Sequence, residues 1–376
     1  MASAAGKETT GIGANAVQGE ASTRTGEGST TDHIKRFHAT IDCRPVDRPC
    51  TWLGLPTEEA WPGLLRHFGC SSKNELIETL DDDIAPVELP YHSPTSDAIY
   101  AAFDFANDPD RDPSHRTLTT RGFFAGKRDP AAVDDFDWPD PALYIDPDEC
   151  RRAVAAVPPG RVVLGVLWSA HFQDACAAFG MEDSLIAMYE APELYRAIID
   201  RITQFYLKAN EVFYEAVGDA LHAVLIGNDF GSQTGLMLSP ALIREFVLPG
   251  TRALIAQSKA YGLRVIHHSC GAIAPIIGDL IEAGADVIHP IQALATGMQP
   301  EALKAAYGDR VAFCGGVDSQ YLLVRGTPDD VRAKVRELRR VFPTGLIISP
   351  SHEAILPDIP PENVAAFIEA ARELDD

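Results

Sequence analysis

The chain has 376 residues, and 46% of them are hydrophobic, which is enough to bury a large core. Asp and Glu number 54 against 32 Lys and Arg, and the resulting net charge of −22 repels nucleic-acid phosphates and anionic membranes. There is no apolar stretch near the roughly 18 residues that span a bilayer, no signal peptide is recognisable, and the seven cysteines are odd in number and widely spaced. We therefore expect a cytoplasmic protein with reduced thiols that binds neither nucleic acid nor membrane.

The first 31 residues contain almost no large apolar side chain and are predicted to be a disordered tail. Residues 32–376 then make up a single folded domain. Its first elements, in chain order, are predicted to be a strand at 50–55, helices at 58–69 and at 73–80 with Ser72 as the N-cap, and a strand at 83–89.

Residues 104–145 are rich in Asp and Pro and are predicted to be mostly long loops. One β-hairpin is expected within them, around TLTTRGFFAGKR at 117–128. Such a stretch suits loops that cover the mouth of a pocket, although no pattern in it identifies a role.

From Arg161 onward, short apolar runs alternate with segments of helical spacing. The predicted strands are 161–169, 222–227, 263–268, 285–290, 311–316 and 345–350. The predicted helices are two within 183–217, broken near Ala191-Pro192, one at 239–262 with Ser239 as N-cap and Pro249 interrupting it, and others at 272–284, 300–308, 327–342 and 361–376.

This alternation predicts a parallel sheet with helical crossovers. Six strands here plus two earlier ones make eight, which favours a (β/α)8 barrel (TIM barrel) with an N-terminal elaboration of loops and helices. An open doubly wound sheet would usually show a Gly-rich phosphate loop after its first strand, and none is present in that context.

Side chains able to bind a metal or take part in catalysis lie at or just after the ends of five of these strands. In a barrel the C-terminal ends of parallel strands share one rim, so these side chains should lie close together. They are Asn228, Asp229, His267, His268, Cys270, His289, Cys314, Asp318, Ser349, Ser351 and His352. Polar residues often end strands because strand ends meet water, which accounts for Asp and Ser. It accounts less well for three runs that end in the rarer His or Cys.

His268-Ser-Cys270 places an imidazole and a thiol on one face of an extended chain, as zinc ligands require. His289 and His352 end later strands on the same rim and complete the predicted metal ligands. Cys314 has two readings, a further ligand or a small buried residue where Gly315 and Gly316 allow tight packing. His267 is read as a core residue or one that supports the site, rather than as a ligand.

Three residues are candidates for catalysis: Asp229, Asp318 and His352. Asp229 could ligate the metal, orient a histidine or bind substrate, whereas the alternative for both aspartates is a cap on a helix or turn.

The C-terminal half carries a resemblance. LSPALIREFVLP at 238–249, FCGGVDSQ at 313–320 and HEAILPDIPPENV at 352–364 resemble the uroporphyrinogen decarboxylase superfamily, and the likeness extends back to Arg161 and more faintly to Asp32. It implies a (β/α)8 barrel with its site at the C-terminal rim, and a homodimer. It leaves the reaction open, because this fold hosts several chemistries.

Two branches of that superfamily are relevant. Uroporphyrinogen decarboxylases use no metal and carry an R-Q-A-G-R-Y segment whose arginines meet substrate carboxylates, whereas the comparable segment here, 44–63, lacks that pattern. His352 matches the decarboxylase histidine near the C-terminal end. Corrinoid-dependent thiol methyltransferases and, more distantly, cobalamin-independent methionine synthase bind zinc through an H-x-C pair, which His268 and Cys270 match. Their third ligand falls at or beside His352, and His289 is nearest to the glutamate of methionine synthase.

The resemblance therefore implies Zn²⁺ as cofactor and a zinc-bound thiol that takes a methyl group from a small donor or from a corrinoid on a partner protein. The alternative is a decarboxylase or related lyase acting on a carboxylated substrate other than uroporphyrinogen, with Asp229 stabilising a protonated intermediate and His352 as general acid. A ligand-binding barrel without catalysis is the third reading. Nothing in the sequence identifies the substrate.

Overall fold

We analysed a computed structural model of the chain, which describes residues 32–106 and 118–373; the predicted N-terminal tail lies outside this part. Eight parallel strands form one sheet in the order β1-β9-β8-β7-β6-β5-β4-β3. This arrangement confirms the predicted barrel. The strands are β1 (Cys50–Thr51), β3 (Ile84–Glu88), β4 (Val162–Trp168), β5 (Ala223–Gly227), β6 (Arg264–His268), β7 (Val287–Ile291), β8 (Ala312–Val317) and β9 (Leu346–Pro350).

Side-chain carboxylates bridge the seam between β1 and β3, which are not paired with each other in the sheet. Asp83, just before β3, accepts a hydrogen bond from the backbone N–H of Thr51 at 2.8 Å. Asp82 accepts one from the N–H of Leu53 at 2.7 Å. Two adjacent acidic residues thus take the place of ladder hydrogen bonds and hold the barrel nearly closed.

The predicted strand at 50–55 is divided in two. β1 joins the barrel, whereas β2 (Leu55–Pro56) pairs in parallel with β10 (Ala354–Ile355) in a separate small sheet. Because β10 follows β9, this second pairing ties the loop after the last barrel strand to the first strand of the chain.

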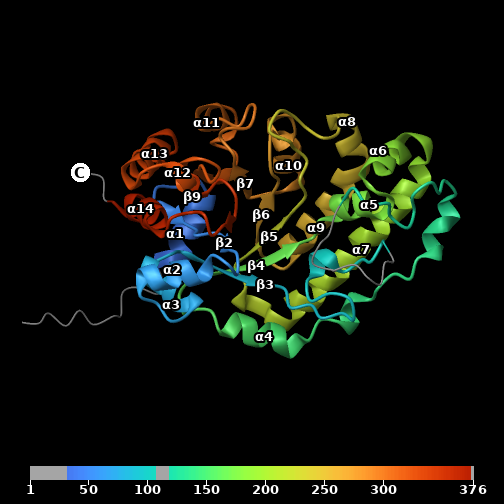
Figure 1. The fold of residues 1–376 in the computed structure, drawn as a ribbon, viewed down its shortest axis with the longest axis horizontal. Helices are drawn as coiled ribbons and strands as arrows, with labels where there is room; N and C mark the ends of the chain where they lie inside the picture. The colour runs from blue at the N-terminus through green and yellow to red at the C-terminus, as the bar shows by residue number, and fades with distance from the viewer. Residues whose placement is uncertain (1–31, 107–117, 374–376) are drawn as a thin grey trace, which may run out of the picture.

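Helices surround the strands, with α5, α6 and α7 on one side of the barrel and α13 and α14 on the other (Figure 1). The α-helices are α1 (Asp32–Ile41), α2 (Trp61–Phe68), α3 (Lys73–Leu80), α4 (Pro147–Ala155), α5 (His171–Phe179), α6 (Met181–Glu190), α7 (Pro192–Val217), α8 (Pro240–Leu242), α9 (Leu248–Ala260), α10 (Ile277–Ala283), α11 (Pro300–Tyr307), α12 (Leu322–Arg325), α13 (Pro328–Val341) and α14 (Pro361–Arg372). Short 3₁₀ helices are η1 (Ile99–Ala101), η2 (Pro130–Asp135), η3 (Pro141–Leu143), η4 (Gly218–Ala220) and η6 (Ala274–Ile276). Within the described ranges, none of these helices combines the length and apolar character needed to cross a membrane.

Strand alternation divides the buried side chains into two cores. On β6, Val265 belongs to the core between strands and helices, whereas Ile266 belongs to the core inside the barrel. The inner core also includes Phe37 and Ile41 of α1, so this helix covers the N-terminal end of the barrel. The opposite, C-terminal end is left for the predicted site.

Local signals in the sequence account for several helix boundaries. The predicted N-cap Ser72 accepts a hydrogen bond from the N–H of Glu75 at 3.1 Å, and Ser239 accepts one from Leu242 at 3.3 Å. The break near Ala191-Pro192 separates α6 from α7 as predicted. At Pro249 the helix is not broken: a π-helical segment, η5 (Ile243–Val247), precedes the proline and joins α8 to α9.

The hairpin predicted at 117–128 is wrong over its described residues, 118–128, which hold turns and no strand. Instead the backbone of this segment bonds to the neighbouring helices. Phe124 N–H donates to the carbonyl of Ala178 at 2.9 Å, and Leu118 accepts from Met181 at 2.7 Å. Its aromatic side chains pack onto the helix layer. The backbone hydrogen bonds and this packing hold the segment in place without a partner strand.

Candidate metal centre and active site

The C-terminal ends of four barrel strands bring together the residues that we call the rim site. They are Asp229 after β5, His268 and Cys270 at and after β6, His289 in β7, and His352 and Glu353 after β9. All but Glu353 were predicted from the sequence. Trp168 at the end of β4 packs edge-on against His268, with ring centroids 5.7 Å apart.

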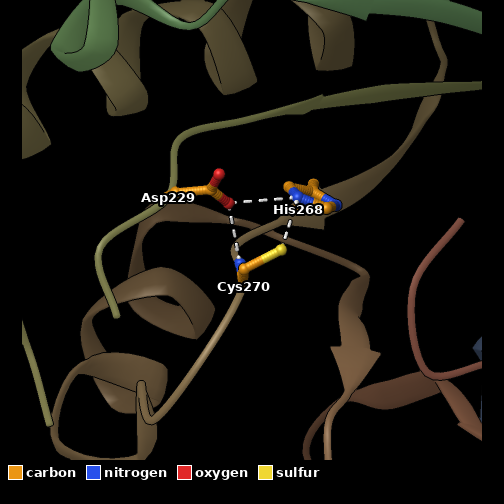
Figure 2. Close-up of side chains that lie close together, drawn as sticks. All are labelled: Asp229, His268 and Cys270. Atoms are coloured by element: carbon orange, nitrogen blue, oxygen red, sulfur yellow. Dashed lines mark hydrogen bonds and ion pairs between the residues drawn. The ribbon is translucent and has the colours of Figure 1, made fainter. Parts of the chain in front are cut away.

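Asp229, His268 and Cys270 form a compact triangle (Figure 2). Asp229 Oδ1 lies 3.2 Å from His268 Nε2 and accepts the backbone N–H of Cys270 at 2.9 Å. Cys270 Sγ lies 3.5 Å from the same His268 Nε2. A carboxylate, an imidazole and a thiol therefore converge on one point.

The chain next to Cys270 has no room for a side chain at position 271. Gly271 has φ +83°, and a Cβ there would come within 2.6 Å of backbone atoms of Gly231 and Ser232. The loop that carries Asp229 and the loop that carries Cys270 are thus packed backbone against backbone, which explains how a β5 residue reaches the H-x-C pair.

Alternation along β6 separates its two histidines. His268 faces the barrel interior and the rim, as does Ile266, whereas His267 faces the helix layer and stacks on Phe230 with centroids 6.1 Å apart. Burial lowers the pKa of His267 to about 3, so its ring is neutral. This placement agrees with the reading of His267 as a core residue.

The second nitrogen of His268 faces a different pair of residues. His268 Nδ1 lies 3.0 Å from His289 Nδ1 and 3.4 Å from Glu353 Oε2. His289 therefore lies on the opposite side of the His268 ring from Cys270 and Asp229. As placed, the predicted ligands divide into two groups, and Asp229 occupies the place next to Cys270 that we expected a histidine to fill.

Glu353 is held in place by the small β2–β10 sheet. Leu55 N–H donates to the carbonyl of Glu353 at 2.6 Å, and Gly54, with φ +94°, lacks the Cβ that would meet this oxygen at 2.4 Å. Glu353 is buried, and its Oε2 has no hydrogen-bond partner. His289 Nε2 is likewise buried without one. These two atoms are therefore available to a ligand, an ion or a water molecule.

His352 borders both groups. Its Nδ1 accepts the N–H of Ala354 at 3.1 Å and lies 3.6 Å from Glu353 Oε2. The contact with the Cys270 thiol raises the pKa of His352; burial opposes this, and the Glu353 charge reinforces it. A neutral His352 in this geometry carries its proton on Nε2 and must release that proton before it ligates a metal.

The electrostatics of the rim site favour positive charge. Burial lowers the pKa of His268, but Glu353, Asp229 and Cys270 outweigh it and raise that pKa well above its usual value. Burial raises the pKa values of Asp229 and Cys270, yet contact with His268 brings both below their usual range. A divalent cation would supply this positive charge in place of the His268 proton.

The triangle also fits a zinc ion by size. Zinc–nitrogen or zinc–oxygen bonds of about 2.1 Å and a zinc–sulfur bond of about 2.3 Å, at tetrahedral angles, place ligand atoms roughly 3.3–3.6 Å apart. The separations from His268 Nε2 to Asp229 Oδ1 and to Cys270 Sγ are 3.2 and 3.5 Å. Asp229, His268 and Cys270 therefore fit zinc in both donor type and spacing, and His352 borders the fourth position.

Asp318 lies apart from the rim site. Its carboxylate accepts the backbone N–H groups of Gln320, Tyr321 and Leu322 at 2.8–3.2 Å, so it caps the turn that begins α12. It also lines a cavity of about 430 Å³ that reaches His352. The capping role was the alternative reading for this residue.

Cys314 is fully buried in the inner core of the barrel, where burial raises the pKa of its thiol. It belongs to neither group of candidate ligands. Of the residues missed by sequence reasoning, Glu353 stands next to His352, and a glutamate there is too common to draw notice. Trp168 has φ +56° at an irregularity in β4, a strained backbone that no sequence pattern reveals.

Comparisons with known proteins agree with this architecture. A sequence model of the family described as Uroporphyrinogen decarboxylase (URO-D) matches residues 126–374. Uroporphyrinogen decarboxylases of Syntrophotalea carbinolica and Geobacter metallireducens are 33% identical over 196 residues and 29% over 187; each match covers 50% of this chain and 51% of the relative. The match thus spans about half the length of these curated relatives. A solved methyltransferase from Methanosarcina mazei superposes with a TM-score of 0.67 over 91% of this chain and 98% of that one, at 17% identity, a likeness of fold.

Proposed function

The chain belongs to the uroporphyrinogen decarboxylase family, and on that premise we propose that it is a zinc-dependent enzyme that transfers a methyl group to a thiol substrate. The observation that carries the proposal is the convergence of Asp229 Oδ1, His268 Nε2 and Cys270 Sγ within 4.8 Å of one another. The methyl group would come from a small donor or from a corrinoid on a partner protein.

In this proposal Asp229, His268 and Cys270 hold the metal, and His352 borders the position left for substrate. A bound zinc supplies a Lewis acid that lowers the pKa of a substrate thiol, so that the thiolate persists at neutral pH.

The remaining rim residues orient these groups. Glu353 and His289 contact the far nitrogen of His268 and fix the direction of its ring. Trp168 covers one side of that ring and limits the access of water.

Decarboxylation of a small carboxylated substrate is the second candidate, and one observation favours it. Because His352 Nδ1 accepts the Ala354 N–H, a neutral His352 presents a proton on Nε2, as a general acid does. Asp229 would then stabilise a cationic intermediate. This reaction does not need a thiol two residues after His268, so it leaves Cys270 without a role.

The deciding experiment is the metal content of protein purified without chelators, measured by plasma mass spectrometry. We expect about one zinc per chain in the wild type and its loss in Cys270→Ala and in His268→Ala. Cys70→Ala is the matched control, because Cys70 is another partly exposed thiol but lies outside the rim site.

A metal-free wild type that also fails to bind added zinc in equilibrium dialysis would overturn the proposal. Decarboxylation assays of the wild type, His352→Gln and Asp229→Asn would then test the second candidate. Zinc retained in both Cys270→Ala and His268→Ala would place the metal elsewhere and would equally contradict the assignment.

A further inference from the structure

In the part of the chain that the structure describes, the lining of the cavity beside His352 lacks the Lys and Arg side chains that would bind a carboxylate-rich substrate. It lies between the loops that follow β7, β8 and β9 and has a volume of about 430 Å³, within the usual range for small-molecule sites. Among the described residues that line it, there is no Lys or Arg. Asp318 and Asp358 contribute carboxylates, and the basic side chain in this lining is His352.

Acidic groups already surround the ring of His352. Glu353 Oε2 lies 3.6 Å from its Nδ1, and the Cys270 thiol contacts the ring as well. The three acidic groups of the rim site, Asp229, Glu353 and Cys270, together more than cancel a divalent cation. Within the described part of the cavity lining, an anionic ligand therefore finds no Lys or Arg with which to pair.

The remaining polar lining is uncharged, and one amide has a defined orientation. Gln292, in the loop after β7, accepts the N–H of Gly271 through Oε1 at 2.8 Å. Its remaining polar atom is Nε2, which can only donate. Gln292 therefore connects the Cys270 loop to the cavity and offers the cavity a neutral hydrogen-bond donor.

Apolar side chains form the rest of the mouth. Leu294 and Leu356 line the cavity and are 56% and 48% exposed, so both present apolar surface at its mouth. Val324 and Ile359 extend the same apolar lining. A ligand with an apolar or weakly polar body would cover these groups.

We infer that this cavity selects an uncharged or cationic small substrate that bears a hydrogen-bond acceptor for Gln292, and that it discriminates against anionic substrates. Within the proposed function, on which this inference rests, the acceptor is a thiol whose tail is neutral or cationic rather than a carboxylate or sulfonate. Each carboxylate close to the ligand disfavours an anion by about fivefold, at about 1 kcal/mol for a close charge pair in a watery site.

Matched thiols test the inference on zinc-loaded protein by isothermal titration calorimetry. The probes are 2-mercaptoethanol, 2-aminoethanethiol and 3-mercaptopropionate, with neutral, cationic and anionic tails. We expect the first two to bind at least about fivefold more tightly than the third. Equal or tighter binding of the anionic thiol would overturn the inference and would leave the proposed function standing.

A variant with an added positive charge tests whether the cavity lining determines the preference among these thiols. Gln320→Lys adds a cation to the exposed lip of the cavity and should improve binding of the anionic thiol by about fivefold. Gln299→Lys, at the exposed start of α11 and outside the lining, is the control and should change nothing. An equal effect of both variants would show that overall charge, rather than this cavity, controls binding.

A metal-free arm separates failure of the inference from failure of the proposed function. If the protein binds no zinc, the proposed function fails, and the cavity is tested with glutaramide against glutarate by saturation-transfer NMR. Preferential binding of glutaramide, lost in Gln292→Leu, would support the inference without the metal. Preferential binding of glutarate would overturn it and would favour a carboxylated substrate.

Discussion

The two ends of the barrel both bury charged side chains, but they treat them in opposite ways. At the N-terminal end, His33 and Arg36 of α1 join residues just before β1, β3 and β4; together these form the floor network: His33, Arg36, Arg48, Asp81, Asp83 and Arg161. Every oxygen of the fully buried Asp83 has close partners there. At the rim site, by contrast, Glu353 Oε2 and His289 Nε2 are buried without a hydrogen bond.

This difference separates charges whose hydrogen bonds are satisfied within the fold from charges that remain available to a ligand. Asp83 Oδ1 accepts Arg36 at 2.6 Å, and its Oδ2 accepts Arg48 and the Thr51 N–H, each at 2.8 Å. A satisfied network of this kind needs nothing from outside the chain. The rim site is paired less completely, as a site that binds something is expected to be.

The largest effect should come from removing the central floor carboxylate. Asp83→Asn leaves Arg36 and Arg48 buried beside a neutral group and should lower the free energy of unfolding by about 3–5 kcal/mol. Urea denaturation measures it. Asp47→Asn is the control, because Asp47 also pairs with Arg36 but is 64% exposed, so its loss should cost less than about 1 kcal/mol. Equal losses in the two variants would show that the floor network is not a buried structural unit.

Removing a rim carboxylate should instead affect metal binding. Glu353→Gln keeps the shape of the side chain but removes the charge near His268 and His352, so zinc affinity should fall about 10- to 100-fold. Competition with a chromophoric chelator measures this affinity. The unfolding free energy of the metal-free protein should fall less than in Asp83→Asn, because His268 can release its proton when the Glu353 charge is lost, whereas Arg36 and Arg48 stay charged. A stability loss as large as that of Asp83→Asn would remove the contrast between the two ends.

The sequence predicted the rim better than the floor, for a physical reason. His268, Cys270, His289 and His352 follow strands of a regular βα repeat, so the common rim could be inferred from chain order alone. The floor network depends on α1, which was missed because it is short and carries charged residues that become buried only against partners about fifty positions away. Such pairings leave no periodic pattern.

The same limit explains the misjudged details of the site. That His289 faces the opposite nitrogen of His268 from Cys270 is a matter of side-chain geometry, which strand order does not determine. Glu353 depends on the pairing of β2 with β10, two strands of two residues each, too short to leave an alternation signal. α4 and α5 were missed because they flank irregular segments, where strands and helices do not alternate regularly.

A pH experiment compares Asp83 of the floor network with its neighbour Asp82, which is buried at the same end of the barrel. Burial raises the pKa of Asp82 to about 7, whereas for Asp83 burial is outweighed by His33, Arg48 and Arg36, and the pKa falls to about 2. The raised pKa means that the stability from protonated Asp82 is fully present below about pH 4 and is lost as the pH rises through about 7. The lowered pKa means that the contribution of Asp83 is present above about pH 4 and is lost as the pH falls through about 2.

Asp82→Asn should therefore gain stability relative to the wild type as the pH rises from 5 to 8, by about 2 kcal/mol. Urea denaturation of metal-free protein at both pH values measures the difference, in which the fixed cost of altered hydrogen bonds to Leu53 and Asp83 cancels. Asp47→Asn should show no such change, because the pKa of Asp47 is lowered and the group stays ionised throughout this range. A flat difference for Asp82→Asn would mean that Asp82 is ionised in the folded protein at pH 5.

The smallest expected effect concerns Asp318. It lies at the C-terminal end of the barrel outside the rim site, and its carboxylate, like that of Asp83, is satisfied by hydrogen bonds within the chain. Because its carboxylate is engaged by three backbone N–H groups, Asp318→Ala should cost about 1 kcal/mol of unfolding free energy, and Asp318→Asn less, since the Asn carbonyl oxygen can still accept the bonds from Tyr321 and Leu322. Zinc content should be unchanged in both. If Asp318→Asn kept its stability and its zinc but lost turnover, the carboxylate would act on the substrate. Asp318 would then have both a structural and a functional role.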